Sequence, residues 1–406
     1  MLNTLCDIIF NVNRHQSLKL ILPAIVSIVA VQWIYMKILK MAKTRNMVDN
    51  PNARKLQENP VPVLGGIAMF FGMLTGILTA CCLFNDVGIH TTLFVAMGIM
   101  LYVGVLDDTI GVSPSTRLLI ETLAILGLIY GSGMCVDSLH GLWGINDFSW
   151  WIGVPVTVFA GLGIINAYNM VDGVNGLSTG LCILCVTMLG AFFIRNGYRS
   201  NATLSFCFAA SLIPFLLHNV FGNKSRMFIG DAGTMVMGLL ITWFVIKVMS
   251  KDGAATFFEH RSSGNLNIAA MLVAFASIPV TDTLRVMTAR IMKGVSPFKP
   301  DQTHLHHAFI KVGVSHSITS LIEIIFNMLV VFILAISFWC GVSLEWQLYI
   351  VVLTSLLFVC GTYSFLTYQI NHDTKLLKKI QKLAVHTHLG HTRGWLKFQK
   401  LLDKGA

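Results

Sequence analysis

The sequence predicts an all-α, polytopic integral membrane protein. Only 12% of its 406 residues are charged and 55% are hydrophobic, whereas about 25% charged residues is usual in soluble domains. The mean hydropathy of +0.71 agrees with this class. Long runs of Leu, Ile, Val and Met recur without the alternation of a barrel strand, and closed barrels are the other structure that can span a bilayer. We therefore predict a bundle of transmembrane helices.

Eleven apolar runs approach the length of about 20 residues that a membrane-spanning helix needs. They are 17–40, 61–84, 91–106, 117–135, 150–169, 176–194, 202–220, 232–249, 267–289, 318–340 and 346–367. The first run is too long for a signal peptide and lacks a small-residue cleavage site, which predicts a retained helix. Pro279 in the ninth run predicts a bend in that helix.

Lys and Arg are distributed unequally between the two sets of connecting segments. One set holds 19 basic residues and the other holds 6; the basic set comprises 42–60, 107–117, 170–176, 221–231, 290–317 and 368–406. Because basic loops remain in the cytoplasm, we predict that this set is cytoplasmic and that the N-terminus lies outside. The net charge of +10 mainly reflects this asymmetry, so it indicates a membrane surface and no nucleic-acid partner.

Two regions are expected along the chain. Residues 1–368 would form the transmembrane domain, and residues 369–406 would form a cytoplasmic tail. Lysines interleave with leucines in this tail, which is typical of a basic amphipathic helix on anionic lipid. A solvated tail is the alternative.

Five polar clusters fall on the predicted cytoplasmic side, and the first is Asp107-Asp108 at the end of the third span. Adjacent carboxylates resist joint ionisation unless a cation or proton intervenes. Carboxylates together with phosphate oxygens are the usual ligands of magnesium. The pair therefore indicates a divalent metal site, with a hydrophilic helix end as the alternative.

The second cluster closes the fifth span. Polar side chains recur at every third residue, at Asn166, Asn169, Asp172 and Asn175. This spacing keeps them on a related face of a helix. Because amides both donate and accept hydrogen bonds, the face suits a nucleobase edge or a carboxylate that must be oriented.

The third cluster is Asp231, at the entrance to the eighth span. An Asp at this place commonly caps the helix. The same helix end also favours a bound phosphate, so the two interpretations are compatible.

The last two clusters are Arg290 and the run from Asp301 to His307, both in the segment 290–317. Their basic and imidazole groups predict a clamp for the phosphates of a nucleotide sugar. One alternative is a basic loop that binds no ligand. The other is a zinc site at His304, His306 and His307, but no Cys or Glu nearby completes it.

Three carboxylates are expected within the spans themselves: Glu121, Asp282 and Glu323. Ionisable groups in a membrane are expensive and usually functional. Arg285 follows Asp282 by three residues, so we interpret these two as an internal ion pair.

Taken in order, the motifs resemble those of the polyprenyl-phosphate N-acetylhexosamine-1-phosphate transferase family. They are VDNPNARK with PVPVLGG, GVLDD, NAYNMVDGVNG, FIGDAGT and SPFKPDQTHLHH, and they cover roughly residues 45 to 315. The HLHH form after SPFKPD is similar to the GlcNAc branch of the family. The muramoyl-pentapeptide branch carries an HHH run, which is absent here.

The resemblance implies magnesium-dependent transfer of GlcNAc 1-phosphate from UDP-GlcNAc to undecaprenyl phosphate. UMP would be released, and synthesis of a lipid-linked O-antigen or common antigen would begin. Manganese is the alternative metal and another UDP-N-acetylhexosamine the alternative donor. The resemblance also implies a multi-pass protein of the bacterial inner membrane with its active site facing the cytoplasm, and it suggests a homodimer. A transporter or flippase is the alternative from another class, but transporters place their sites near the bilayer midplane.

The family's functional residues carry over to matching positions of this chain. The catalytic set is Asp107, Asp108 and Asp172, and the metal ligands are Asp231, Asp107 and Asp108. The resemblance implies a substrate-binding set of Arg117, Asn175, Arg290, Asp301, His304, His306 and His307. The amide face of the second cluster adds Asn166 and Asn169 to this expectation. Bacterial members usually have Asp where this chain has Asn175, a position associated with uracil. An amide still pairs with uracil, so we expect activity to survive with an altered nucleotide affinity.

Overall fold

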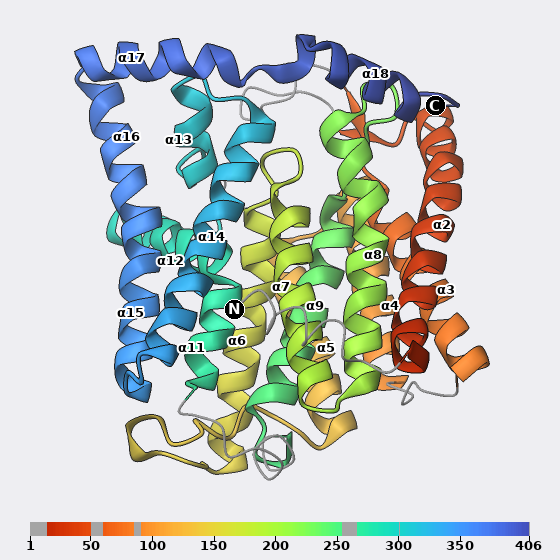
Figure 1. The fold of residues 1–406 in the computed structure, drawn as a ribbon, viewed down its shortest axis with the longest axis vertical. Coiled ribbons are helices and arrows are strands. Elements are labelled where there is room, and N and C mark those ends of the chain that lie inside the picture. Colours follow the sequence, from red (N-terminus) through yellow and green to blue (C-terminus); the bar gives the residue numbers. More distant parts are fainter. Residues whose placement is uncertain (1–13, 50–59, 85–90, 254–265, 300, 406) are drawn as a thin grey trace.

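The computed structural model describes residues 14–49, 60–84, 91–253, 266–299 and 301–405. It confirms the all-α fold class: long helices run side by side in a bundle, and two short helices lie across one end (Figure 1). Residues 50–59 of the first family motif lie outside the described residues, as do residues 1–13, 85–90 and 254–265, which fall in the less basic set of connecting segments.

The described elements follow one another along the chain in this order. The helices are α2 (Arg14–Thr44), α3 (Gly65–Phe84), α4 (Thr91–Ile110), α5 (Pro114–Ser132), α6 (Trp150–Met170), α7 (Leu177–Arg195), α8 (Arg199–Phe221), α9 (Gly230–Met249), α11 (Ile268–Phe275), α12 (Ser277–Met292), α13 (Leu305–Lys311), α14 (His316–Trp339), α15 (Leu344–Leu356), α16 (Thr362–Asn371), α17 (Lys375–Ala384) and α18 (Arg393–Leu402). A two-residue antiparallel ladder joins β1 (Val48–Asp49) to β2 (Val61–Pro62).

Within the described chain, nine helices are long and apolar enough to cross a membrane, and one bent pair makes a tenth. All ten coincide with spans predicted from the sequence. The one remaining predicted span, 117–135, is the fourth in order along the chain. It corresponds to the 19-residue helix α5, which packs against α4 and α6. Arg117 and Glu121 lower the hydropathy of this helix. The protein is therefore a multi-pass membrane protein.

The ninth predicted span is broken into α11 and α12, which meet at an angle of 80°. The break lies at Ala276, three residues before Pro279. The buried Asn327 of α14 bridges it: its amide nitrogen donates to the carbonyls of Ala274 and Phe275, and its oxygen accepts from Ile278 N (3.2 Å) and from the Ser277 hydroxyl. One side chain thus satisfies backbone groups on both sides of the break, which the membrane interior requires.

Helix α9 lies at the centre of the bundle, where most of its residues are buried. Glycines let the neighbouring helices approach it closely. A Cβ on Gly66 of α3 would meet Gly233 N at 2.4 Å, and one on Gly104 of α4 would meet Ala232 Cα at 2.3 Å. Small residues at helix contacts are the usual means of close packing in membranes. This packing holds the start of α9 against the end of α4.

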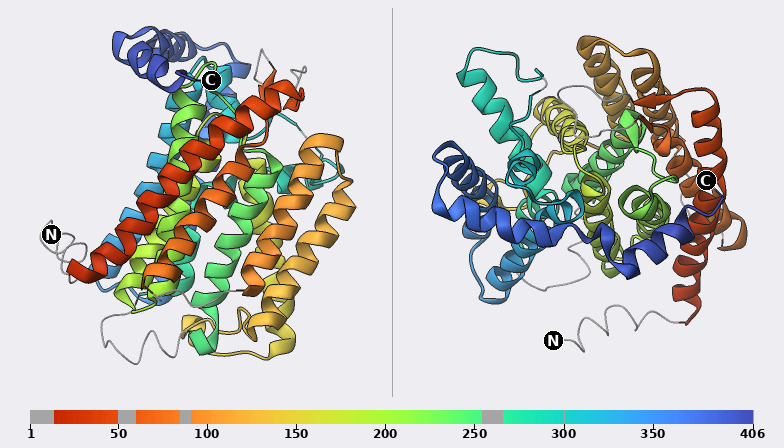
Figure 2. Two further views of the ribbon diagram at one scale, coloured as in Figure 1. Left: turned by 90° about the vertical axis from the view of Figure 1, so that its right-hand side faces the viewer. Right: turned by 90° about the horizontal axis from the view of Figure 1, so that it is seen from above.

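The tail forms two helices, α17 and α18, and not a single one. Seen from above, they run along one side of the bundle from α16 to the neighbourhood of α2 (Figure 2). Asp403 fastens the far end, because its carboxylate accepts hydrogen bonds from Asn223 N, Ser225 N and the Ser225 hydroxyl at 2.8–3.1 Å. The tail is therefore packed onto the bundle.

Candidate functional site

A cavity of about 870 Å³ lies at the end of the bundle where α18 rests. Each of the six basic segments contributes to its wall. One residue from each is Asp49, Asp107, Asp172, Arg226, His307 and Trp395. Segments far apart in the sequence therefore meet at one place, on one side of the bundle.

The acidic end of the cavity is formed by Asp107, Asp108 and Asp231. Asp108 reaches from α4 to the start of α9, where its two oxygens accept hydrogen bonds from Asp231 N (2.9 Å) and Ala232 N (3.2 Å). A carboxylate at this place satisfies N–H groups that lack partners within the helix. Gly230, with φ +73°, leaves room for it, because a Cβ there would meet Asp108 Oδ2 at 2.3 Å. The N-terminus of α9 is thus capped by Asp108 and not by Asp231.

Arg117 of α5 lies behind this acidic end. Its Nη1 is 3.4 Å from Asp107 Oδ2 and 3.5 Å from Asp231 Oδ1, and its Nε donates to Glu121 Oε1 at 2.9 Å. One cation therefore contacts three carboxylates from three helices. The predicted place of Arg117 beside the acidic pair agrees with this geometry.

The two asparagines of α6 have different surroundings. Asn169 lines the cavity and donates to Asp231 and to the Thr234 hydroxyl. Asn166 is buried deeper, and it donates to Glu121 Oε2 and Leu162 O, both at 2.9 Å. Asn169 therefore orients a carboxylate of the cavity directly, whereas Asn166 supports the partner of Arg117.

Asp172 and Asn175 line the cavity from the turn between α6 and α7. The Ser178 hydroxyl donates to the Asp172 carboxylate at 2.5 Å. Asp172 is exposed to the cavity, and desolvation by the dense protein around that cavity raises its pKa to about 6, while the Ser178 hydrogen bond lowers it and the charge of Asp231 raises it. The carbonyl oxygen of Asn175 accepts from the Ser320 hydroxyl at 2.8 Å. This turn is therefore tied to the start of α14.

The three histidines of the predicted clamp lie at different depths. Only His307 lines the cavity; His306 is fully buried against Gly173, and His304 lies behind His306 with its ring parallel at 5.5 Å. Burial lowers the pKa of His307 to about 4 and holds the pKa of His306 well below its usual value. Both imidazoles are therefore neutral near pH 7. They can offer hydrogen bonds but no positive charge.

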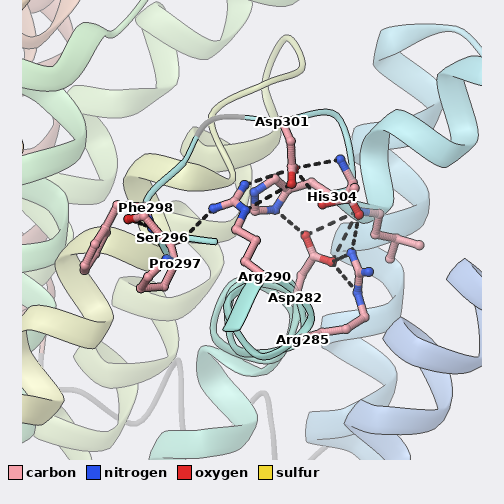
Figure 3. A network of polar contacts seen from close by, with 10 residues as sticks. Asp282, Arg285, Arg290, Ser296, Pro297, Phe298, Asp301 and His304 are labelled. Atoms are coloured by element: carbon pink, nitrogen blue, oxygen red, sulfur yellow. Dashed lines mark hydrogen bonds and ion pairs between the residues drawn. The ribbon is translucent and has the colours of Figure 1, made fainter. Parts of the chain in front are cut away.

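Arg290 and Asp301 do not line the cavity. They form a bidentate pair, with Arg290 Nε to Asp301 Oδ2 at 3.0 Å and Arg290 Nη2 to Asp301 Oδ1 at 2.9 Å (Figure 3). Arg290 also donates to Pro297 O, and hydrogen bonding to Arg290 holds the pKa of the Asp301 carboxyl well below its usual range. The pair therefore braces the loop 290–307, and a role for either residue in substrate binding stays a prediction.

The buried Asp282 confirms the predicted internal pair and extends it. It accepts from Arg285 Nη2 at 2.7 Å, lies 2.8 Å from His304 Nδ1 and accepts from Leu305 N (Figure 3). Arg285 in turn lies 3.8 Å from the centre of the Tyr363 ring. Asp282 thus anchors the start of α13, which carries His307 to the cavity.

Several cavity residues were not singled out from the sequence: Asp49, Asn219, Arg226, His316, Ser317, Trp395 and Gln399. Arg226 lies two residues ahead of the FIGD motif, which was a local signal. Trp395 and Gln399 belong to the tail, and no local pattern indicates that this tail folds over the cavity.

The acidic end suits a divalent cation by its chemistry. Asp107 and Asp231 both face the cavity and lie near the same Arg117 nitrogen. No group of three His, Cys, Asp or Glu side chains placed to hold a metal occurs among the described residues. Magnesium fits this donor set, because it is commonly held by one or two carboxylates together with substrate phosphates.

Comparisons with known proteins agree on one family. The model of "Glycosyl transferase family 4" matches residues 90–249. An undecaprenyl-phosphate alpha-N-acetylglucosaminyl 1-phosphate transferase of Yersinia pestis is 31% identical over 284 residues, which is 68% of this chain and 72% of the relative. The protein of the same name from Escherichia coli K12 is 29% identical, with the same shares of both chains covered. A Bacillus subtilis protein named "Probable undecaprenyl-phosphate N-acetylglucosaminyl 1-phosphate transferase" is 26% identical over 76% of this chain and 82% of its own length.

Proposed function

The chain belongs to glycosyl transferase family 4, the polyprenyl-phosphate N-acetylhexosamine-1-phosphate transferases, and we propose that it transfers GlcNAc 1-phosphate from UDP-GlcNAc to undecaprenyl phosphate. UMP is the second product. The relatives' names support both the sugar and the lipid. In a bacterial inner membrane, this reaction would start a lipid-linked surface polysaccharide on the cytoplasmic side.

The observation that carries the proposal is the acidic end of the cavity. Asp107, Asp108 and Asp231 meet there, next to amides suited to a nucleoside. Two anionic substrates must come together for the reaction, and a metal ion with positioned side chains compensates such charge. An acidic site without a metal would repel both substrates, so the arrangement favours a metal-dependent phosphoryl transfer.

Magnesium, with manganese as an alternative, would be held by Asp107 and Asp231, whose carboxylates face the cavity. Bound there, it would neutralise charge on the donor diphosphate. Asp108 would position the start of α9, and through it Asp231, because both of its oxygens already accept backbone N–H groups. Arg117 and Asn169 would keep the Asp231 carboxylate oriented.

The bond changes are simple. An oxygen of the lipid phosphate attacks the phosphorus that carries the sugar, and the bond from that phosphorus to the bridging oxygen of the diphosphate breaks. UMP leaves with that oxygen, and a lipid-linked sugar diphosphate forms. Since a phosphate monoester has a second pKa of about 6, the attacking oxygen is already ionised near pH 7. Asp172 would therefore orient the acceptor or the donor and need not deprotonate either.

The nucleoside would lie toward Asn175, whose amide can pair with uracil. His307 would donate to an oxygen of the donor from the same part of the wall. Four residues would act indirectly, by holding α13, which carries His307, and the segment that precedes it. They are Arg290, Asp301, His304 and His306. A different UDP-N-acetylhexosamine is the alternative donor, because sequence identity near 30% leaves the sugar open.

The test is a transfer assay with purified protein, undecaprenyl phosphate, magnesium and a panel of radiolabelled UDP-sugars. We expect label from UDP-GlcNAc in the lipid phase, release of UMP, and loss of both after chelation of the metal. Label from another sugar alone would replace the donor and keep the reaction. No lipid label with any donor would refute the proposal.

Substitutions of the cavity carboxylates test whether the reaction takes place in the cavity. We expect Asp107→Asn and Asp231→Asn to lower kcat by about 100-fold or more, the order seen when a transition-state charge contact is removed. Asp373→Asn is the matched control, because Asp373 is an exposed carboxylate outside the cavity with φ +40°, a conformation that Asn tolerates. Near-normal turnover and metal dependence in both cavity variants would contradict the assignment.

A further inference from the structure

Part of the cavity wall comes from the C-terminal tail. Trp395 and Gln399, one turn apart on α18, line the cavity. They belong to the inward face of the helix, together with Phe398 and Leu402, which are also partly buried. Leu396, Lys397, Lys400 and Leu401 are exposed on the remaining surface. The helix therefore turns an aromatic ring and an amide toward the cavity.

Several contacts hold α18 in this place. The Trp395 ring packs on Phe221 with centroids 4.5 Å apart, and Phe398 contacts the same ring edge-on at 5.2 Å. Thr392 caps the helix by accepting from Trp395 N, and Asp403 binds the loop at Asn223 and Ser225. Because contacts hold both ends and the centre of α18, the Trp395 side chain has a single position in the cavity wall.

The nearest cavity residues connect this wall to the turn that carries Asn175. Val220, adjacent to Phe221, lines the cavity and closely approaches Gly176, where an added Cβ would meet Val220 Cγ2 at 2.5 Å. The start of α14 contacts the same turn through Ser320 and Asn175. Trp395 and the turn that carries Asn175 are thus linked through α8.

Arg226 adds a cation to this wall. It lines the cavity, and its buried Nε has no hydrogen-bond partner among the described residues. The pKa of Arg226 is lowered by burial, with Asp403 acting in the opposite direction. A guanidinium in a wall that also holds an aromatic side chain suits a phosphate joined to a planar base.

We propose that α18 is part of the donor site: Trp395 and Gln399 contact the nucleoside of the UDP-sugar, and Arg226 contacts a phosphate oxygen next to it. The proposal rests on the proposed function and adds the tail to its substrate site. An aromatic face binds a base by stacking, while Gln399 offers a donor and an acceptor. The diphosphate would then extend from this wall toward the acidic end.

The experiment measures UMP binding by calorimetry, together with the KM values of both substrates, on full-length purified protein. For Trp395→Ala, we expect the Kd of UMP and the KM of UDP-GlcNAc to rise by about 10-fold or more, with the KM of undecaprenyl phosphate and kcat changed by less than about threefold. Trp395→Phe should recover most of the affinity, because it keeps an aromatic face. Lys397→Ala is the matched control, since Lys397 is exposed on the same helix.

Each outcome decides something. An unchanged Kd of UMP in Trp395→Ala, or a raised KM for the lipid alone, would overturn the proposal. If Trp395→Ala fails to fold, Gln399→Ala and Trp395→Phe supply the test. A Kd of UMP in Gln399→Ala equal to that of the wild type would count against a contact between Gln399 and the nucleoside. If the wild type binds UMP through Trp395 but transfers no sugar, the proposed reaction fails while this inference stands.

Discussion

Arg117 joins the acidic end of the cavity to the interior of the bundle. It contacts Asp107, Asp231 and the fully buried Glu121. Removing one partner of a buried pair leaves an uncompensated charge, which costs more than the pair itself contributes. The residue therefore serves stability as well as the site.

For Arg117→Gln, we expect a loss of roughly 3–5 kcal/mol of stability, because Glu121 stays buried without its cation. The double variant Arg117→Met with Glu121→Met removes both charges and should recover most of this loss. Thermal unfolding in detergent measures the difference. Equal destabilisation of the single and double variants would show that Glu121 does not depend on Arg117.

Asp172 gives a prediction about pH. Its folded pKa of about 6 lies above the usual Asp value of about 3.9, so its stabilising contribution is present at low pH and is lost as the pH rises through about 6. We expect Asp172→Asn to melt above the wild type at pH 7.5 and close to it at pH 4.5. A melting difference that does not change with pH would contradict this environment for Asp172.

At the scale of elements, the break at Ala276 is where α12 begins, and α12 leads toward α13, which carries His307. Asn327 bonds to backbone groups on both sides of that break. Asn327→Leu leaves these groups unsatisfied, and each costs about 1–3 kcal/mol. We expect a lower melting temperature and reduced activity, because the position of His307 in the cavity depends on the placement of α12 and α13.

Ser337→Ala is the control on the same helix, because within the part of the chain that the structure describes the Ser337 hydroxyl donates to Leu334 O, one turn earlier in α14. We expect it to change the melting temperature little. A similar loss in both variants would indicate that any polar deletion in α14 has this effect, and that the break has no special dependence on Asn327.

The tail helix α17 exposes both leucines and lysines. Leu376 and Leu383 are 44% and 70% exposed, and Lys375, Lys378, Lys379 and Lys382 lie on the same helix. Apolar groups flanked by cations bind anionic lipid. We therefore expect slower amide exchange in α17 when the full-length protein is placed in anionic bilayers than in neutral ones.

Replacing those four lysines by Gln should abolish this difference while leaving exchange in α9, the buried central helix, unchanged. The difference should also shrink at high salt, since the attraction is screened. Equal exchange in neutral and anionic bilayers would instead support a solvated tail.

At the scale of the whole molecule, the cavity gathers the six segments that hold most of the basic residues. This convergence agrees with a single functional side. We expect that side to be cytoplasmic: a fluorescent protein fused after residue 406 should fluoresce, and alkaline phosphatase fused after residue 145 should be active. The opposite pattern would reverse the orientation and place the nucleotide site outside the cell.

The ten spans and the acidic residues were predictable from the sequence, because hydropathy and the order of motifs are local properties. α5 was predicted as a span although Arg117 and Glu121 reduce its hydropathy. The bend in the ninth span was expected from Pro279, but its place at Ala276 depends on Asn327, about fifty residues later. Such a contact leaves no signal in the local sequence.

Composition, periodicity and motif order were enough to predict the fold class, the gathering of the polar clusters on one side of the bundle, and the family. Which of these polar groups face the cavity follows from the way the helices pack in three dimensions. This packing paired Arg290 with Asp301 outside the cavity wall, turned Asp108 toward the backbone of α9, and brought Trp395 over the site from the tail. The physical reason is that each of these depends on which helices pack together, and side chains at the same kind of position bind substrate or bind one another according to that packing.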